Sequence, residues 1–479
     1  MATTRPTKWY SWYADTDSKE DRKLILKLDL LIVPVAVIMY WIKYIDQSNI
    51  NNAYVAGLSD DLGFYGNELV HLQTMYTVGA VVGQLPFTVL FPKLPMHWLI
   101  PGLDIGWGIF TLLQYRAKGY SEMMAYRFLV GLLESAYFPA VHYVLGSWYK
   151  SYEIGRRGGV FYTGLTLGTL TSGLIQSAAS ANLDGKNGLA GWRWMYVIVS
   201  IMTFAVGFAG IWLWPGTPDK PNLFILTKEE VELAKHRTGD IGQKPGSGFS
   251  WNIVTRVFLR WRFWILVLWA IFFWNACYNT NAGGYLLWLK SLDRYSASRV
   301  NQLGTSSPGI GIFYVLFICF GSDMFLGRAG AITLAHVWNL IGLIILLVWD
   351  VPESALWFAF NTTYSAVAMS SVLYGWANDI LKHDIDERAF TLVAMNAIAQ
   401  STTAWTPLLV FKTVEAPRFL KGYAFTAANA VALIVMTQFI RILHNRQERL
   451  YEKQHSLETE SPMAQDIQVS ANKDIGRQN

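Results

Sequence analysis

The chain has 479 residues, of which 52% are hydrophobic and only 15% are charged. Because soluble proteins contain about 25% charged residues, this composition excludes an ordinary water-soluble globular protein. The net charge of +5 is small for the length and argues against nucleic-acid binding. Two lone cysteines, Cys277 and Cys319, provide neither a disulfide framework nor the spacing of a metal site.

Long apolar segments recur along the whole sequence. A helix needs roughly 20 mostly apolar residues to cross the hydrocarbon core of a bilayer. We therefore predict an all-α membrane protein with twelve transmembrane helices, at residues 28–46, 67–90, 98–115, 121–144, 157–178, 192–214, 263–287, 303–321, 329–349, 354–377, 388–411 and 423–443.

Polar segments divide this series into two halves of six helices. The halves, 28–214 and 263–443, are separated by a polar linker at 215–262. The flanking tails are 1–27 and 444–479, and the second is charged and expected to lack fixed structure. Lys and Arg are concentrated in the tails and the linker, so the positive-inside rule predicts that both termini are cytoplasmic.

The linker contains one predicted surface helix. Thr227 precedes the sequence KEEVELAKHR, and Glu230 occupies the position that a capping box requires. This pattern is typical of the first turn of a helix in water.

An internal repeat supports the division into halves. The segment GSWYKSYEIGRRGGVF (146–161) joins the fourth and fifth spans, and YGWANDILKHDIDERAF (374–390) joins the tenth and eleventh. Trp148 matches Trp376, and Arg157 matches Arg388 at a similar offset. Two parallel repeats related by an axis along the membrane normal, as in many transporters, would produce this pattern.

Several stretches resemble the fungal allantoate-permease branch of the major facilitator superfamily, within its anion:cation symporters. They are YIDQSNINNAYVAGLSDDLGFYGNEL (44–69), YRFLVGLLESAYFPAVHYVLGSWYK (126–150) and NLDGKNGLAGWRWMYVI (182–198). A further stretch, WANDILKHDIDERAFTLVAMNAIAQSTTAW (376–405), is most similar to the pantothenate-transporter subgroup. The resemblance implies the major facilitator fold, a plasma-membrane location and a chain that works as a monomer.

The superfamily's gating motif is retained in only one half. The loop between the second and third spans reads FPKLPMHW (91–98) and departs from the usual Gly/Asp/Arg-rich motif. The matching loop of the second half, GSDMFLGRAG (321–330), keeps Asp323 and Arg328. The resemblance therefore implies a gating role for Asp323 and Arg328, and we assign Arg157 and Arg388 to the same group.

Charged residues inside predicted spans are costly and are candidate functional residues. Arg127 and Glu134 are seven residues apart in the fourth span and therefore share one helix face. A guanidinium is a planar partner for a carboxylate, and a buried carboxyl can take up and release a proton near neutral pH. The resemblance implies that Arg127 binds a substrate carboxylate and Glu134 carries a proton. The alternatives are a structural ion pair, or an Arg127 that reaches from a helix end to the outer lipid headgroups.

The first span ends with a second pair, Lys43 and Asp46, three residues apart on one face. The resemblance implies that Asp46 takes part in proton coupling, although it could instead pair with Lys43. Lys43 is a second candidate ligand for the anion. Asp104 in the third span is also intramembrane, but the sequence assigns it no role.

Polar side chains of the second half complete the candidate site. Asn275 and Asn279 share a face of the seventh span and could hydrogen-bond a substrate or join helices. The other candidate substrate-binding residues are Tyr374, Asn396, Gln400 and Trp405.

We expect a secondary transporter that imports a small organic anion with protons by alternating access, and pantothenate is the expected substrate. Allantoate, nicotinate and biotin are alternative carboxylates, and a nutrient sensor that binds without transporting is the alternative of another class. The chain has no GxxxxGK[ST], HxxxxD, DHHC or HExxH motif, so we expect neither an ATP-driven pump nor an enzyme, and neither a cofactor nor a metal.

Overall fold

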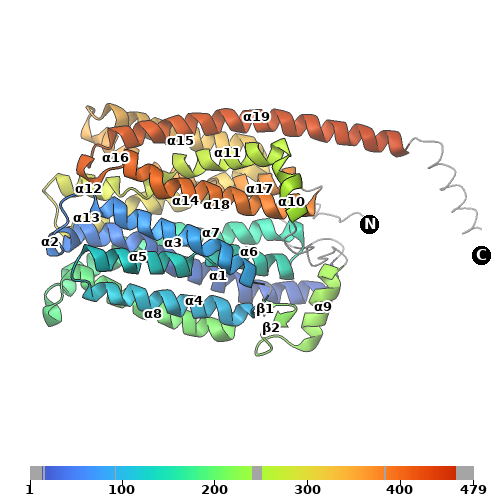
Figure 1. Ribbon diagram of the computed structural model, residues 1–479, viewed down its shortest axis with the longest axis horizontal. Helices are drawn as coiled ribbons and strands as arrows, with labels where there is room; N and C mark the ends of the chain where they lie inside the picture. The colour runs from blue at the N-terminus through green and yellow to red at the C-terminus, as the bar shows by residue number, and fades with distance from the viewer. Residues whose placement is uncertain (1–12, 14–16, 92, 240–250, 382–383, 460–479) are drawn as a thin grey trace, which may run out of the picture.

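The computed structural model describes the chain except residues 1–12, 14–16, 92, 240–250, 382–383 and 460–479. Its long helices run side by side, roughly parallel to one another (Figure 1). The helices α1–α8, here called the first half, lie together, and α11–α19, the second half, lie against them. The predicted all-α fold is confirmed.

Each of the twelve predicted spans corresponds to one helix or to a pair of helices in line. Eight helices make a span alone: α1 (Lys19–Ala53), α3 (Glu68–Leu90), α4 (Met96–Leu113), α7 (Ser151–Asn182), α8 (Gly191–Leu213), α15 (Gly327–Val348), α18 (Ile385–Val410) and α19 (Leu420–Thr459). Four spans are broken: α5 (Tyr120–Glu134) with α6 (Tyr137–Trp148), α11 (Trp261–Ala276) with α12 (Gly284–Ser291), α13 (Ala297–Gly304) with α14 (Ser306–Gly321), and α16 (Glu353–Asn361) with α17 (Ser370–Ile380). Among the described residues, seven of these segments have the length and mean hydropathy of a membrane span.

The breaks in two of the spans line the centre of the molecule. Short 3₁₀ turns, Tyr278–Thr280 and Thr363–Val367, separate α11 from α12 and α16 from α17. Gly283, the N-cap residue before α12, has a φ of +71°, a left-handed conformation that favours glycine. Irregular backbone at membrane depth is tolerated where it is buried in protein or lines a cavity, so these turns indicate where a binding site lies.

The linker packs at one end of the helices, here called the linker end. It contains a small hairpin, β1 (Gly216–Thr217) and β2 (Lys220–Pro221), and the helices α9 (Lys228–Gly239) and α10 (Trp251–Phe258). The capping box predicted for α9 is present: Glu230 N–H donates to Thr227 Oγ1 at 3.3 Å, and Thr227 N–H donates to Glu230 Oε2 at 2.9 Å. The opposite end carries the short α2 (Ser59–Asp61), α12 and α13 (Figure 1).

Two expectations about segment ends need correction. The C-terminal segment is not irregular from residue 444, because α19 continues as one helix to Thr459. Its last turns are charged and leave the bundle, so hydropathy alone marks the end of the apolar segment rather than the end of the helix (Figure 1). The first helix likewise begins at Lys19, where Ser18 caps it through a complete capping box with Asp21.

The register of the internal repeat also differs from the sequence match. Lys150 and Asp384 are the N-caps of α7 and α18, so Glu153 and Glu387 occupy the equivalent third positions. Both glutamates are buried, and each binds an arginine from the linker region: Glu153 accepts from Arg237 of α9, and Glu387 from Arg260 between α10 and α11. Arg157 and Arg388 lie at different turns of their helices and are not equivalent.

Candidate functional site

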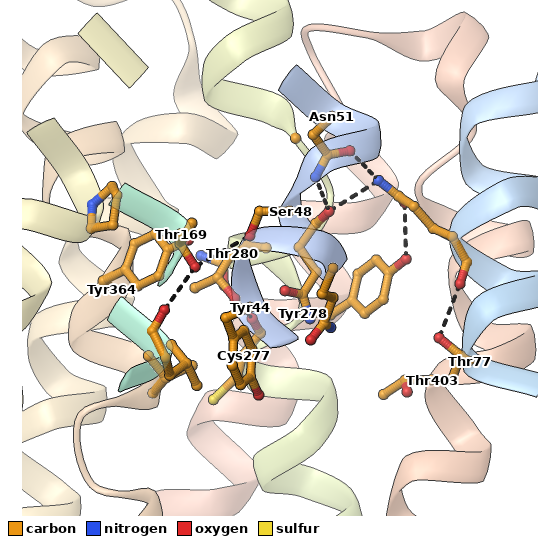
Figure 2. Close-up of a pocket in the computed structure, with 18 of the residues that line it drawn as sticks. Tyr44, Ser48, Asn51, Thr77, Thr169, Cys277, Tyr278, Thr280, Tyr364 and Thr403 are labelled. Carbon is orange, nitrogen blue, oxygen red and sulfur yellow. Dashed lines mark hydrogen bonds between the residues drawn. The ribbon is translucent and has the colours of Figure 1, made fainter. Parts of the chain in front are cut away.

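A central cavity of about 220 Å³ lies between the two halves. Its walls come from both halves, with polar residues of α1, α3 and α7 facing the broken span α11–α12 and helix α18. Figure 2 shows Thr169 and Tyr364 on one side of this space and Thr77 with Thr403 on the other. In each of these pairs one residue comes from the first half and the other from the second, so the cavity lies on the boundary between the halves.

A network of amides closes the cavity toward the end opposite the linker. Gln73 Nε2 donates to Asn51 Oδ1 at 2.6 Å and to the backbone carbonyl of Asn281 at 3.1 Å. Asn51 Nδ2 donates to the same carbonyl, and Tyr278 donates from its hydroxyl to Gln73 Oε1 at 3.3 Å (Figure 2). Residues of α1 and α3 are thereby bonded to the break in the seventh span, across the boundary between halves.

Two further hydrogen bonds join the halves beyond this network, at the same end of the molecule. Val70 N–H donates to Thr413 Oγ1 at 3.2 Å, and Val414 N–H donates to Asn67 Oδ1 at 3.3 Å. Toward the linker end, Gln84 donates to Gln400, and Asn396 donates to Gln84 at 3.4 Å. Polar contacts therefore bound the cavity on both sides.

Arg127 is held in the wall of this cavity. It lies on α5, its side chain is buried with 1% of its surface exposed, and its guanidinium lies 4.7 Å from the centre of the Tyr76 ring. Within the described part of the chain, neither Nε nor Nη1 has a hydrogen-bond partner. A buried arginine with unused donors facing a cavity is suited to bind a planar anion.

Glu134 lies close behind the same ring. Tyr76 donates from its hydroxyl to Glu134 Oε2 at 2.5 Å, whereas Oε1 has no partner among the described residues. Glu134 is fully buried and does not line the cavity. Tyr76 thus contacts both Arg127 and Glu134, the arginine through its ring and the carboxyl through its hydroxyl.

The second predicted pair, Lys43 and Asp46, lies on α1, but the two side chains do not form an ion pair with each other. Lys43 lines the cavity and interacts electrostatically with Glu134 and Asp104. Asp46 is fully buried, accepts a hydrogen bond from the Thr111 hydroxyl and interacts electrostatically with Arg127. The structure therefore brings two cations, Lys43 and Arg127, together with three buried acids.

Four of the six polar residues predicted in the second half line the cavity. They are Asn279, Tyr374, Asn396 and Gln400. Tyr374 accepts from the Trp274 indole at 3.0 Å, and Asn279 donates to Asn339 at 3.4 Å. These groups are neutral hydrogen-bonding side chains that face the charged wall of the first half.

The other two residues do not line the cavity. Asn275 joins helices instead: its Nδ2 donates to Thr402 at 2.8 Å, and its Oδ1 accepts from Thr406 at 3.0 Å. Trp405 is 56% exposed and faces away from the protein interior. For Trp405, the sequence of α18 could not distinguish the helix face toward the cavity from the outer face, because polar residues occur on both faces.

The residues assigned to gating lie at or near the linker end. Arg157 binds Asp29 of α1 through two hydrogen bonds of 2.5 and 2.7 Å, and its guanidinium lies 4.2 Å from the centre of the Tyr149 ring. Arg388 is partly buried in the first turn of α18, and Arg328 is partly buried at the start of α15. The Asp323 side chain lies outside the described residues, so its pairing with Arg328 stays a prediction.

Sequence reasoning missed Tyr76, Gln73, Asn51 and Thr111. Each is an uncharged polar residue in an apolar helix, and the sequence gives no reason to prefer it over other residues of the same kind. Tyr76 lies in α3, and its relation to Arg127 depends on how closely α3 and α5 pack. Only the tertiary structure provides that information.

Three comparisons with known proteins agree with this architecture. Residues 36–407 match the family described as Major Facilitator Superfamily. The chain is 38% identical over 464 residues to the vitamin H transporter of Saccharomyces cerevisiae, covering 94% of this chain and 77% of that protein. It is 30% identical over 410 residues to the pantothenate transporter liz1 of Schizosaccharomyces pombe, covering 85% and 79%.

Among solved structures, the xylose transporter XylE from E. coli, in a partially occluded inward open conformation, has a TM-score of 0.66 at 15% identity. The similarity covers 85% of this chain and 98% of that chain. At this identity the comparison shows the shared fold alone. The predicted resemblance to pantothenate transporters is confirmed by the curated relatives, and the chain belongs to the major facilitator superfamily as a multi-pass membrane transporter and not an enzyme.

Proposed function

We propose that the protein imports a carboxylate vitamin by proton symport, through alternating access of the cavity between residues 28–214 and 263–443. The observation that carries this proposal is Arg127, a buried cation at the cavity with unused donors, joined through Tyr76 to the buried carboxyl of Glu134. Both termini are proposed to be cytoplasmic, in the plasma membrane, and the chain is proposed to work as a monomer.

Arg127 and Lys43 would bind the carboxylate, because they are the cations at the cavity among the described residues. The neutral residues Asn279, Tyr374, Asn396 and Gln400 would hydrogen-bond the uncharged part of the substrate. Such a division suits a molecule with one carboxylate at one end and amide, ureido or hydroxyl groups further along.

Glu134 would carry the proton. When a substrate carboxylate reaches Arg127, a negative charge is added to a buried site, and protonation of Glu134 would compensate for it. Asp46, which interacts electrostatically with Arg127, is proposed to assist this coupling. With charges balanced, the halves could exchange the contacts at the closed end for contacts at the linker end.

The substrate is proposed to be biotin or pantothenate. Pantothenate is the expectation from the sequence, and a relative named as a pantothenate transporter is 30% identical. Biotin is a second candidate because the relative named as a vitamin H transporter is 38% identical over 94% of the chain. Allantoate and nicotinate remain alternatives for the case in which neither vitamin enters.

Uptake of both labelled vitamins tests this proposal. The chain is expressed in fungal cells that lack their own biotin and pantothenate uptake, and entry is measured at external pH 5 and pH 7. We expect faster entry of one vitamin at pH 5, abolished by a protonophore and by Arg127→Ala. Glu134→Gln should retain exchange of bound substrate but lose the pH dependence.

The controls separate the parts of the proposal. Arg127→Lys keeps the charge but lacks the planar fork, so uptake should fall by about tenfold or more, as expected for loss of a charge-assisted hydrogen bond. Surface expression with no entry of any carboxylate would contradict transport and favour a sensor. Uptake that ignores pH and survives Glu134→Gln would contradict the coupling mechanism alone.

A further inference from the structure

Asp104 is a buried carboxyl that the proposed cycle does not use. It lies in the middle of α4 with 0% of its surface exposed. The helix packs closely on α8: a Cβ added at Gly207 would lie 3.4 Å from the Asp104 Cβ and 2.9 Å from Ile105 Cγ1. Within the described part of the chain, neither carboxyl oxygen of Asp104 has a hydrogen-bond partner.

Two titratable groups interact electrostatically with Asp104: Lys43 of α1 and Tyr137 of α6. Glu134 of α5 interacts with Lys43. The Tyr137 hydroxyl donates to the Ala36 carbonyl at 2.8 Å, so its proton is already engaged. Arg127, also on α5, interacts electrostatically with Asp46 and Glu134. The other titratable groups of the helices packed on α4 are His97 on α4 itself, Arg116 beyond it, Tyr120, Glu122 and Tyr126 on α5, His142 and Tyr143 on α6, and Arg193 and Tyr196 on α8.

Lys43 is therefore the one cation among the described residues that interacts with Asp104, and it also lines the cavity. An ionised carboxyl without hydrogen bonds is strongly unfavourable in a sealed apolar site unless an opposite charge is close. Asp104 can thus be ionised while Lys43 is its counter-ion. Asp104 must bind a proton when a substrate carboxylate takes its place as the partner of Lys43.

We propose that Asp104 is a second proton-carrying residue: it is the counter-ion of Lys43 in the empty transporter and is protonated when the substrate is bound. This inference rests on the proposed function, in which Glu134 carries the first proton. In this cycle Asp46 is assigned the charge that stays, since the Thr111 hydroxyl donates to its carboxylate and it interacts electrostatically with Arg127.

The charges then determine the stoichiometry. In the empty protein, two cations face three ionised acids, which leaves a net charge of about −1. In the loaded protein, two cations face Asp46 and the substrate, which is neutral because Glu134 and Asp104 hold protons. Two protons therefore accompany each monovalent carboxylate, and one net positive charge enters per cycle.

Replacing Asp104 by asparagine should remove one of these protons. The purified protein and Asp104→Asn are reconstituted in vesicles with the vitamin that the cells import, and accumulation is measured with the membrane potential held at zero. For each unit of pH gradient, the limiting accumulation should fall from about 100-fold to about tenfold, because each coupled proton contributes one factor of ten.

Membrane potential provides the second readout. At equal pH on both sides, a potential that is negative inside should drive accumulation by the wild type but not by Asp104→Asn. Exchange of labelled for unlabelled vitamin shows that the variant is folded and binds substrate. Glu232→Gln, which changes an exposed carboxyl of α9 to an amide, is the matched control and should behave as the wild type.

If Asp104→Asn does not fold, Lys43→Gln provides a second test of the inference. Without its cation, Asp104 should stay protonated throughout, so Lys43→Gln should also lose one coupled proton and the response to potential. An Asp104→Asn protein with two coupled protons would overturn the inference, as would a Lys43→Gln protein that keeps both. A wild type with no proton coupling, or a Glu134→Gln protein that keeps the full proton number, would instead overturn the proposed function on which the inference rests.

Discussion

Tyr76 is the residue that links the substrate ligand to the proton carrier. Its ring lies under the Arg127 guanidinium, and its hydroxyl donates to Glu134. A cation over an aromatic face and a hydrogen bond to a buried carboxyl are separate interactions, and different substitutions can remove them one at a time.

Tyr76→Phe should change the pH dependence of uptake and leave substrate affinity nearly unchanged. The ring under Arg127 remains, so the KM at pH 5 should stay within about twofold, whereas the ionised form of Glu134 loses a hydrogen bond worth about 1.5–3 kcal/mol. Uptake falls as the pH rises, and in Tyr76→Phe this fall should occur at a higher pH than in the wild type. Initial rates measured between pH 5 and pH 8 test this.

Tyr76→Leu is the comparison, because it also removes the ring under Arg127. Its KM should rise by severalfold in addition to the altered pH profile. A Tyr76→Phe protein with the pH profile of the wild type would show that the hydroxyl does not act on the proton carrier.

At the scale of helices, the close packing of α3 on α5 positions Tyr76 beside Arg127 and Glu134. A Cβ added at Gly131 of α5 would lie 2.1 Å from the backbone oxygen of Tyr76, and one at Gly79 of α3 would lie 2.2 Å from the backbone oxygen of Phe128. Small residues on facing helices permit this approach in membranes.

Gly131→Ala should force α3 and α5 apart and reduce uptake to about a tenth or less, with a destabilisation of about 1–3 kcal/mol from overpacking. The readouts are uptake and the melting temperature of the purified protein. Gly102→Ala on α4 is the matched control, since nothing lies within 4 Å of its added Cβ. Equal losses in the two variants would contradict a specific role for the α3–α5 contact.

The linker helix α9 depends on a buried ion pair. The Glu153 side chain of α7 and the Arg237 side chain of α9 are each 2% exposed. Glu153→Gln should lower stability by about 3–5 kcal/mol, because it leaves the Arg237 charge buried and unpaired.

Thermal unfolding in detergent measures this effect. Adding Arg237→Gln to Glu153→Gln should restore part of the lost stability, since the stranded charge is gone. The exposed Glu232 of the same helix, whose side chain is 75% exposed, provides a control that should shift the melting temperature little. If the destabilisation of the double variant equalled the sum of the destabilisations of the two single variants, the result would argue against a buried pair.

At the scale of the whole molecule, most of the hydrogen bonds described above between the halves lie at the end opposite the linker, as in a transporter closed on that side. Ser177 of α7 and Ser298 of α13 face each other there, with their hydroxyl oxygens 3.0 Å apart. Alternating access requires these two helices to separate in every cycle.

The double variant Ser177→Cys/Ser298→Cys should form a disulfide under mild oxidation and lose uptake, and a reductant should restore it. Initial rates before oxidation, after oxidation and after reduction provide the measurement. The single variants should transport with and without oxidant, which also tests the native Cys277 and Cys319. Continued uptake by the fully cross-linked protein would contradict alternating access by separation of the halves.

The sequence by itself determined the twelve spans, the linker and its capped helix α9, and the candidate charges Arg127, Glu134, Lys43 and Asp46, because hydropathy, capping and intramembrane charge are local signals. The resemblance added the family and the class of substrate. Only the tertiary structure decided which groups meet: that Tyr76 contacts both Arg127 and Glu134, that Asn275 joins helices while Asn279 lines the cavity, and that Asp104 interacts with Lys43. The physical reason is that helices distant in sequence bring these residues together through close packing, which a one-dimensional pattern does not encode.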